Sequence, residues 1–137
     1  MRIFMDDDRN HPVGEDWVVV RTVEDMIDLV DRHDAEIREI SFDNDLRQKL
    51  DGIHGLTMIR ERMLDDPTRL PSLERITVHS LNGEAARAML NDLVSYVKHG
   101  VLPPIEIRRR PAEGSLYPLL TEDHRDIVAY VRPVEKA

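Results

Sequence analysis

The sequence contains no cysteine, few aromatic residues and no long apolar run. Without cysteine, the chain cannot form a disulfide, a thiolate metal site or a cysteine nucleophile. Aromatic residues make up only 4% of the chain, so a core must be built mainly from Leu, Ile, Val and Met. No stretch has the length of a transmembrane helix, and the N-terminus turns acidic by residue 6, which does not fit a signal peptide. We therefore expect a cytoplasmic protein that does not contact membranes.

The chain also lacks an excess of positive charge. Its 137 residues carry a formal net charge of -8. Broad, sequence-independent binding to DNA or RNA needs a basic face, so we expect no broad DNA binding. A small pocket for a nucleotide or for the phosphate at an RNA end stays compatible with this charge. The length fits a single domain with one core.

Short apolar runs alternate with amphipathic stretches, which predicts an α/β fold with a mainly parallel, five-stranded sheet between two helical layers. The strands are expected at 2–6, 17–22, 36–43, 75–80 and 104–111. The helices are expected at 23–33, 55–65 and about 83–98. Thr22 should cap the first helix, with Asp25 at its third position. The first two strands have no clear helix between them, so this part departs from a regular flavodoxin-like fold.

The domain is expected to span residues 1–111. Residues 112–137 then form a C-terminal extension that packs on the same domain and contains a strand-like run at 126–133.

Polar side chains gather where the predicted strands end. They are Asp6, Asp7 and Asp8 after the first strand, Asp43 and Asp45 after the third, His79, Ser80 and Asn82 after the fourth, and Arg108, Arg109 and Arg110 at the fifth. Ligands of open parallel sheets bind beyond the carboxyl ends of the strands, and in a strand order of 2-1-3-4-5 the first and third strands are neighbours. The two acidic clusters should therefore meet, and a cation or a phosphate-bearing ligand would compensate their repulsion.

Carboxylate oxygens are the ligands that suit Mg²⁺, which keeps several waters for phosphate oxygens. We expect Asp6, Asp7 and Asp43 to hold this ion, with Asp8 and Asp45 as possible groups around it. Asp43 is also a candidate catalytic residue. The joint pattern predicts a site for Mg²⁺ and phosphate at this edge.

The fourth strand supplies the candidates for catalysis. His79 is expected to act as acid or base near neutral pH, and Ser80 and Asn82 to position a phosphate oxygen. Arg9, Arg110 and Asp45 are predicted to line the phosphate pocket, where an arginine adds charge-assisted hydrogen bonds. Plainer interpretations stay open, because acidic runs are often solvated surface and a histidine at a strand end is more often structural than catalytic.

The arrangement of these residues resembles response-regulator receiver domains. The matching places are taken by Asp6, Asp7, Asp43, Ser80 and Arg110, the last standing before Pro111. The resemblance implies that the acid pair and Asp43 bind Mg²⁺ and that Asp43 accepts a phosphoryl group. An arginine stands where receivers have a lysine, and the first helix is missing.

A divergent branch, the cyclic-phosphate processing receiver-like family, is a closer match. The segments "MRIFMDDDR", "WVVVRT-x-E", "ISFDNDL" and "TVHSLN" resemble its motifs, in its order, over about residues 1–98. The resemblance implies action on 2′,3′-cyclic phosphate ends in RNA repair or in conflict with mobile elements. The leading hypothesis is thus a Mg²⁺-assisted phosphoesterase. A phospho-accepting or non-catalytic receiver-like module, or a phage-type adaptor, that binds a protein partner is the alternative, so the sequence leaves open whether the protein is an enzyme.

Overall fold

The structure is a computed structural model that describes residues 1–9, 11, 14, 16–80, 83–110 and 127–128. Its sheet has the strand order β2-β1-β3-β4-β5-β6. The strands are β1 (Arg2–Met5), β2 (Trp17–Val20), β3 (Glu39–Phe42), β4 (Arg75–Val78), β5 (Glu106–Arg109) and β6 (Ile127–Val128). The first five strands pair in parallel, and β6 pairs antiparallel with β5. The predicted parallel sheet and the adjacency of its first and third strands are confirmed.

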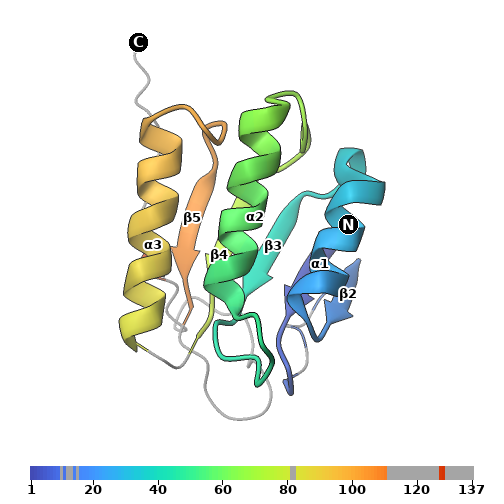
Figure 1. The fold of residues 1–137 in the computed structure, drawn as a ribbon, viewed down its shortest axis with the longest axis vertical. Coiled ribbons are helices and arrows are strands. Elements are labelled where there is room, and N and C mark those ends of the chain that lie inside the picture. The colour runs from blue at the N-terminus through green and yellow to red at the C-terminus, as the bar shows by residue number, and fades with distance from the viewer. Residues whose placement is uncertain (10, 12–13, 15, 81–82, 111–126, 129–137) are drawn as a thin grey trace.

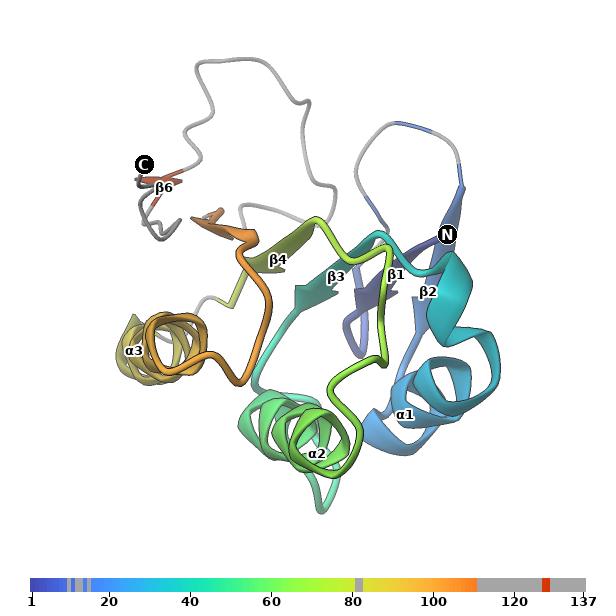
Figure 2. The same ribbon diagram turned by 90° about the horizontal axis from the view of Figure 1, so that it is seen from above.

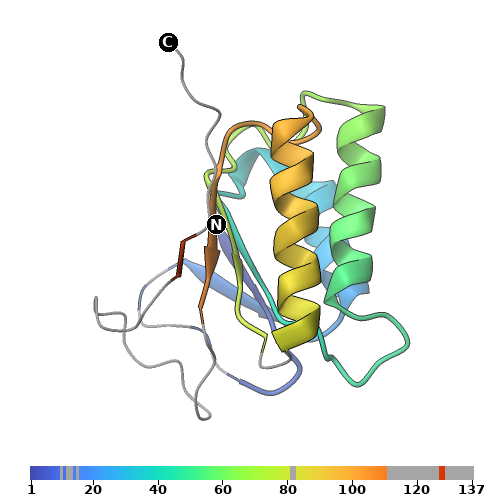
Figure 3. The same ribbon diagram turned by 90° about the vertical axis from the view of Figure 1, so that its left-hand side faces the viewer.

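Three helices cover one face of this sheet, as Figures 1, 2 and 3 show from three directions. They are α1 (Val23–His33), α2 (Gly52–Asp65) and α3 (Gly83–Lys98), and a short 3₁₀ turn, Asp34–Glu36, follows α1. The receiver-like α/β fold is confirmed. Of the three layers expected, the described residues form two, the sheet and one helical layer. As predicted, no helix occurs among the residues that the structure describes between β1 and β2.

Two helix starts are fixed by different side chains. Thr22 caps α1 as predicted, since its Oγ1 accepts the backbone N–H of Asp25 at 3.1 Å. α2 begins at Gly52, three residues before the predicted start at residue 55. The reason is a capping box in which the backbone N–H of Asp51 donates to Nδ1 of His54 at 3.0 Å. The sequence pattern missed this box because its third helical residue is a histidine in place of glutamate or glutamine.

Gly52 also fixes where α2 lies relative to the sheet. Its N–H donates to the carbonyl oxygen of Asn44 at 2.9 Å, and a Cβ at this position would lie 2.0 Å from the carbonyl oxygen of Asp43. Only glycine allows so close an approach of two backbones. The start of α2 is therefore pinned against the residues that end β3.

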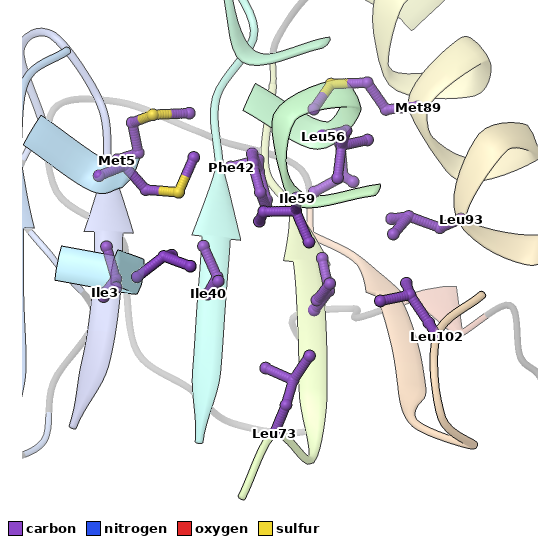
Figure 4. Close-up of a cluster of buried hydrophobic side chains, with 14 of the residues drawn as sticks. Ile3, Met5, Ile40, Phe42, Leu56, Ile59, Leu73, Met89, Leu93 and Leu102 are labelled. Carbon is purple, nitrogen blue, oxygen red and sulfur yellow. The ribbon is translucent and has the colours of Figure 1, made fainter. Parts of the chain in front are cut away.

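The core lies between the sheet and its three helices. Alternation along the strands turns every second side chain towards the helices. One row across four parallel strands consists of Ile3, Ile40, Ile76 and Ile107, all fully buried. Leu56 and Ile59 of α2 and Leu93 of α3 lie among the side chains that close this core from the helical side (Figure 4). Burying each such side chain contributes roughly 2 kcal/mol.

The opposite face of the sheet carries a row of charges of alternating sign, which we call the charge row. Its members are Arg2, Glu39, Arg75, Glu106 and Arg108. The ion pairs between successive members are 2.8–3.3 Å long. The first four are the first residues of β1, β3, β4 and β5, so strand register alone places opposite charges side by side. Each charge of the row thus has an opposite charge beside it.

The C-terminal extension is described only at β6, which lies within the strand-like run predicted at 126–133. Its other residues, and the predicted packing of 112–137 on the domain, lie outside the described residues. None of the helices that the structure describes combines the length and the apolar character needed to cross a bilayer.

Candidate functional site at the carboxyl edge of the sheet

The candidate site is the row of side chains that follows the last residues of the strands. Its members stand one position past the ends of β1, β3, β4 and β5, namely Asp6, Asp43, His79 and Arg110. Their backbone N–H groups still donate to carbonyl oxygens of neighbouring strands at 2.8–3.1 Å. Alternation therefore puts the four side chains on the face opposite the helices. This edge is where the arrowheads of Figure 1 point.

Asp6 is fully buried, and both of its oxygens accept hydrogen bonds. Oδ1 accepts the backbone N–H groups of Asp8 and Arg9, each at 2.8 Å. Oδ2 lies 3.0 Å from Nε of Arg9 and 3.0 Å from Nε2 of His79. Burial alone would raise the pKa of Asp6, but the hydrogen bonds from His79 and from the two backbone N–H groups hold it well below its ordinary range. Asp6 is therefore an ionised carboxylate with no acceptor position left.

His79 lies beneath the edge, fully buried, with its ring stacked on Phe4 at a centroid distance of 4.4 Å. Burial lowers the pKa of His79, so the ring is neutral. Since the Asp6 carboxylate can only accept, Nε2 carries the proton, and Nδ1 accepts the hydroxyl of Ser41 at 2.7 Å. Both ring nitrogens are thus engaged with protein groups. The predicted role of His79 as acid or base stays a prediction.

Asp43 is 4% exposed and has a freer carboxylate than Asp6. Its Oδ1 accepts the backbone N–H of Asn44 at 2.8 Å, and Oδ2 has a longer contact of 3.4 Å to Nη2 of Arg9. Burial and the negative charge of Asp6 raise the pKa of Asp43 to about 6. A carboxyl group with this pKa exchanges its proton near neutral pH.

Arg9 joins the two carboxylates. Its Nε contacts Asp6 and its Nη2 contacts Asp43, while the side chain is only 10% exposed. The third nitrogen, Nη1, is buried and has no hydrogen-bond partner among the residues that the structure describes. Arg21 fixes the loop behind it, because its Nη1 donates to the carbonyl oxygens of both Asp6 and Arg9 at 3.0 Å. Arg9 is therefore held rigidly with one buried donor unsatisfied.

The other two acidic residues of the first cluster, Asp7 and Asp8, contact Arg47. Asp7 pairs with Nε of Arg47 at 2.7 Å, and Nη2 of the same arginine lies 4.0 Å from the exposed Asp8. Arg47 is itself 76% exposed, so this contact lies at the surface. The structure thus brings Asp6 and Asp43 together as predicted, and gives Asp7 an ion pair of its own beside them.

The other predicted residues lie around this centre. Ser80 is buried. Asp45 is exposed, and its Oδ1 accepts a hydrogen bond from Nδ2 of Asn44 at 2.9 Å. Arg110 lies close enough to His79 for its charge to help lower the pKa of that histidine. Asn82 falls outside the described residues.

Sequence reasoning did not single out Ser41 and Asn44. Ser41 stands two positions before Asp43, so alternation could have placed it on the same face as His79. The side chain of Asn44 accepts the backbone N–H of Ile53 at 3.1 Å and thereby ties α2 to the site. No local sequence pattern predicts this contact, because Asn44 and Ile53 are brought together only when α2 packs against β3.

Asp6, Asp43 and His79 each offer one ligand atom within 4.8 Å of the others, so the group could hold a metal ion. Mg²⁺, which the receiver resemblance implies, prefers six oxygens at about 2.0–2.1 Å. Here one of the three ligands is a nitrogen, the oxygens of Asp6 already accept four donors, and the guanidinium of Arg9 lies against both carboxylates. The residues present do not fit Mg²⁺ unless Arg9 leaves its position.

Comparison with known proteins agrees with this geometry. The model of one family, described as the cyclic-phosphate processing receiver domain, matches residues 1–95, which is more than half of the chain. No curated protein and no solved structure matches the chain. The matched segment runs from β1 into α3 and includes Asp6, Arg9, Asp43 and His79. As the motifs at the strand ends predicted, the chain belongs to the family of cyclic-phosphate processing receiver domains.

Proposed function

We propose that the domain binds a phosphate ester at the carboxyl edge of its sheet and opens the 2′,3′-cyclic phosphate of an RNA end or a nucleotide. One observation carries this proposal: Arg9 contacts two carboxylates through Nε and Nη2, while its buried Nη1 lacks an acceptor within the described residues. Leaving such a donor unsatisfied costs about 1–3 kcal/mol. A phosphate oxygen is a charge-matched acceptor for a guanidinium. The family to which the chain belongs supports the substrate class.

Water opens a cyclic phosphate by forming one P–O bond while a bond from phosphorus to a ribose oxygen breaks. The attacking water gives up a proton, and the leaving oxygen takes one up. We assign this proton transfer to Asp43, because within the described residues its Oδ2 has only the 3.4 Å contact to Arg9. Asp6 is unsuited to it, since both of its oxygens are already saturated with donors. Ser80 and Arg110, which follow β4 and β5, are the groups we assign to orienting the phosphate.

His79 has a positioning role in this proposal. Its Nε2–H holds the Asp6 carboxylate, which in turn holds Arg9. The sequence-based hypothesis of direct proton transfer by His79 gives a different result in one experiment. With His79→Gln, a positioning role lowers turnover and keeps the pH profile of the wild type, whereas loss of an acid or base removes one limb of that profile.

Turnover is tested by incubating the protein with nucleoside 2′,3′-cyclic monophosphates and following the phosphorus NMR signals of the cyclic ester and its products. Arg9→Gln and Asp43→Asn should each lower the rate by about 10²-fold or more. Arg47→Asn is the matched control, because it removes a positive charge that pairs with Asp7 at the same edge of the sheet. Absence of hydrolysis of every cyclic monophosphate by the wild type would refute the proposal.

A second candidate function is a receiver-like module that accepts a phosphoryl group and binds a protein partner. The position of Asp43 favours it, since this residue directly follows β3 and lies beside the buried Asp6. Treatment with a small phosphodonor such as acetyl phosphate, followed by intact-mass measurement, tests this function. A phosphorylated wild type and an unmodified Asp43→Asn variant, together with no cyclic-phosphate hydrolysis, would establish the module in place of the enzyme.

A further inference from the structure

The two carboxylates at the carboxyl edge already have a cation between them. Nε of Arg9 lies 3.0 Å from Asp6, and Nη2 of the same guanidinium lies 3.4 Å from Asp43. All three side chains are at least nine-tenths buried, with exposed fractions of 10%, 0% and 5%. Buried carboxylates at this range repel each other unless a positive charge compensates them. Arg9 supplies that charge from within the chain.

We infer that Arg9 is a built-in counter-ion that occupies the place a divalent cation would need between Asp6 and Asp43, so that this site binds its phosphate ligand without a metal. The phosphate part of this inference rests on the proposed function. The part that concerns the metal rests on the contacts of Arg9 alone.

The coordination chemistry of the site argues for this inference. A divalent cation needs lone pairs directed at it, and the oxygens of Asp6 give theirs to four donors. Two of these donors are backbone N–H groups of the loop that follows β1, so they cannot rotate away as a side chain can. The remaining open oxygens belong mainly to Asp43, and a single carboxylate next to a guanidinium is a poor cation site.

The loop also limits the freedom of Arg9 to leave. The backbone N–H of Arg9 donates to the Asp6 carboxylate, and Nη1 of Arg21 donates to the carbonyl oxygens of Asp6 and Arg9. The side chain leaves this closed loop towards Asp43. Displacing it would leave the two buried carboxylates without a positive charge in contact with both, which is unfavourable. The backbone of the loop therefore fixes the position of the Arg9 guanidinium.

Arg9 has a second property that a simple structural ion pair does not explain. Two of its nitrogens satisfy the carboxylates, whereas Nη1 is buried without an acceptor in the part of the chain that the structure covers. The same guanidinium can thus compensate the acidic pair and donate to a phosphate oxygen.

The test measures thermal unfolding of three proteins at neutral pH, with Mg²⁺ at about 10 mM or with EDTA, using the metal alone as probe. The wild type should melt at the same temperature with Mg²⁺ and with EDTA. Arg9→Gln, which removes the charge and keeps a polar side chain, should gain a Mg²⁺-dependent rise of about 3 °C or more, because the position on Oδ2 of Asp6 that Nε of Arg9 occupied and Oδ2 of Asp43 can then bind the ion. Arg9→Lys keeps a charge and should stay insensitive to Mg²⁺.

Arg47→Asn is the control variant, because Arg47 compensates Asp7 and Asp8 at the exposed surface of the same edge. Asparagine suits its positive φ of 58°. This variant should show no Mg²⁺ response, since Arg9 still lies against Asp6 and Asp43. A Mg²⁺ response of the wild type, or equal responses of Arg47→Asn and Arg9→Gln, would overturn the inference.

A second measurement separates this inference from the proposed function. Binding of a slowly hydrolysed nucleoside 2′,3′-cyclic phosphorothioate is followed by calorimetry in EDTA and in Mg²⁺. Equal affinity in the two buffers, lost in Arg9→Gln, supports the inference, whereas binding that requires Mg²⁺ refutes it. If nothing binds in either buffer, the proposed function and the phosphate part of the inference fail. The assignment of Arg9 as counter-ion is then decided by the melting curves alone.

Discussion

Two groups of charged side chains lie on the face of the sheet opposite α1, α2 and α3, and they are compensated in different ways. The charge row at the amino ends of the strands alternates in sign, so every member contacts an opposite charge. The site at the carboxyl edge has two buried carboxylates, a neutral histidine and two arginines, Arg9 and Arg110. The row is satisfied by the protein itself. The site keeps an arginine donor without an acceptor among the described residues.

The two groups shift the pKa of an acid in opposite directions, as one acid from each group shows. For Glu106 of the charge row, burial alone would raise the pKa, but hydrogen bonds from Arg75 and Arg108 hold it below its ordinary value. For Asp43 of the site, burial and the charge of Asp6 raise the pKa to about 6. The charge row therefore stabilises the ionised form of Glu106, whereas the site destabilises the ionised form of Asp43. A buried carboxyl group whose pKa is raised in this way is typical of a functional site.

The largest effect is expected from removing the cation of the site. Arg9→Ala leaves Asp6 and Asp43 buried without a positive charge, and loss of one partner from a buried ion pair costs about 3–5 kcal/mol in the free energy of unfolding. Urea unfolding at neutral pH measures it. Adding Asp43→Asn to this variant should restore part of the loss, because one carboxylate is then neutral. Equal losses in the single and double variants would show that the repulsion between these acids is not what Arg9 relieves.

Asp43→Asn alone should increase stability at neutral pH. In the wild type the pKa of Asp43 is about 6 in the folded protein against an ordinary value of 3.8, so the folded state binds this proton more tightly. The stability that Asp43 contributes is present below pH about 4 and is lost as the pH rises through about 6, a total on the order of 3 kcal/mol.

The measurement is chemical unfolding of wild type and Asp43→Asn at several pH values across this window. The difference between the two proteins should be small near pH 4 and largest above pH 6, with the variant the more stable. A variant that is less stable than the wild type above pH 6 would mean that the ionised carboxylate is favourable where it stands.

A smaller effect is expected at the centre of the charge row. Arg75→Gln removes the ion pairs of 3.2 Å to Glu39 and 2.9 Å to Glu106. Because the arginine side chain is 31% exposed, water replaces part of what is lost, and we expect about 1–2 kcal/mol. The decrease should shrink when the pH falls far enough to protonate Glu106, whose pKa the hydrogen bonds from Arg75 and Arg108 hold below its ordinary value against the effect of burial. A pH-independent decrease would show that packing of the side chain, and not its charge, was lost.

The smallest effect is expected at the end of the same row. Arg108→Gln removes the pair of 2.8 Å to Glu106, whose side chain is 34% exposed. Pairs of this kind contribute about 0.5 kcal/mol or less. Thermal unfolding at low and high salt measures it, and the difference from wild type should shrink as salt is added. An effect as large as that of Arg9→Ala would remove the distinction between the two groups of charges.

Much of the fold could be predicted from short-range patterns. Apolar runs identified the five parallel strands, and the period of apolar residues in 23–33 and 83–98 gave α1 and α3 with their bounds. The early start of α2 escaped this reasoning. It depends on a histidine cap and on the contact of Gly52 with the backbone after β3, and the second of these exists only between segments that have already packed.

The sequence by itself determined which residues meet at the carboxyl edge. In a parallel sheet with β1 beside β3, the residues that follow these strands must be neighbours, so Asp6 and Asp43 were placed from topology alone. The roles of the side chains around them were decided only by the tertiary structure. Arg9 belongs to a loop, where no periodicity fixes the direction of a side chain, and its position between the carboxylates follows from the closed backbone around Asp6 and from Arg21. Likewise, only packing could bury His79 between Ser41 and Asp6 and engage both of its nitrogens, because burial and hydrogen-bond partners depend on contacts between distant strands.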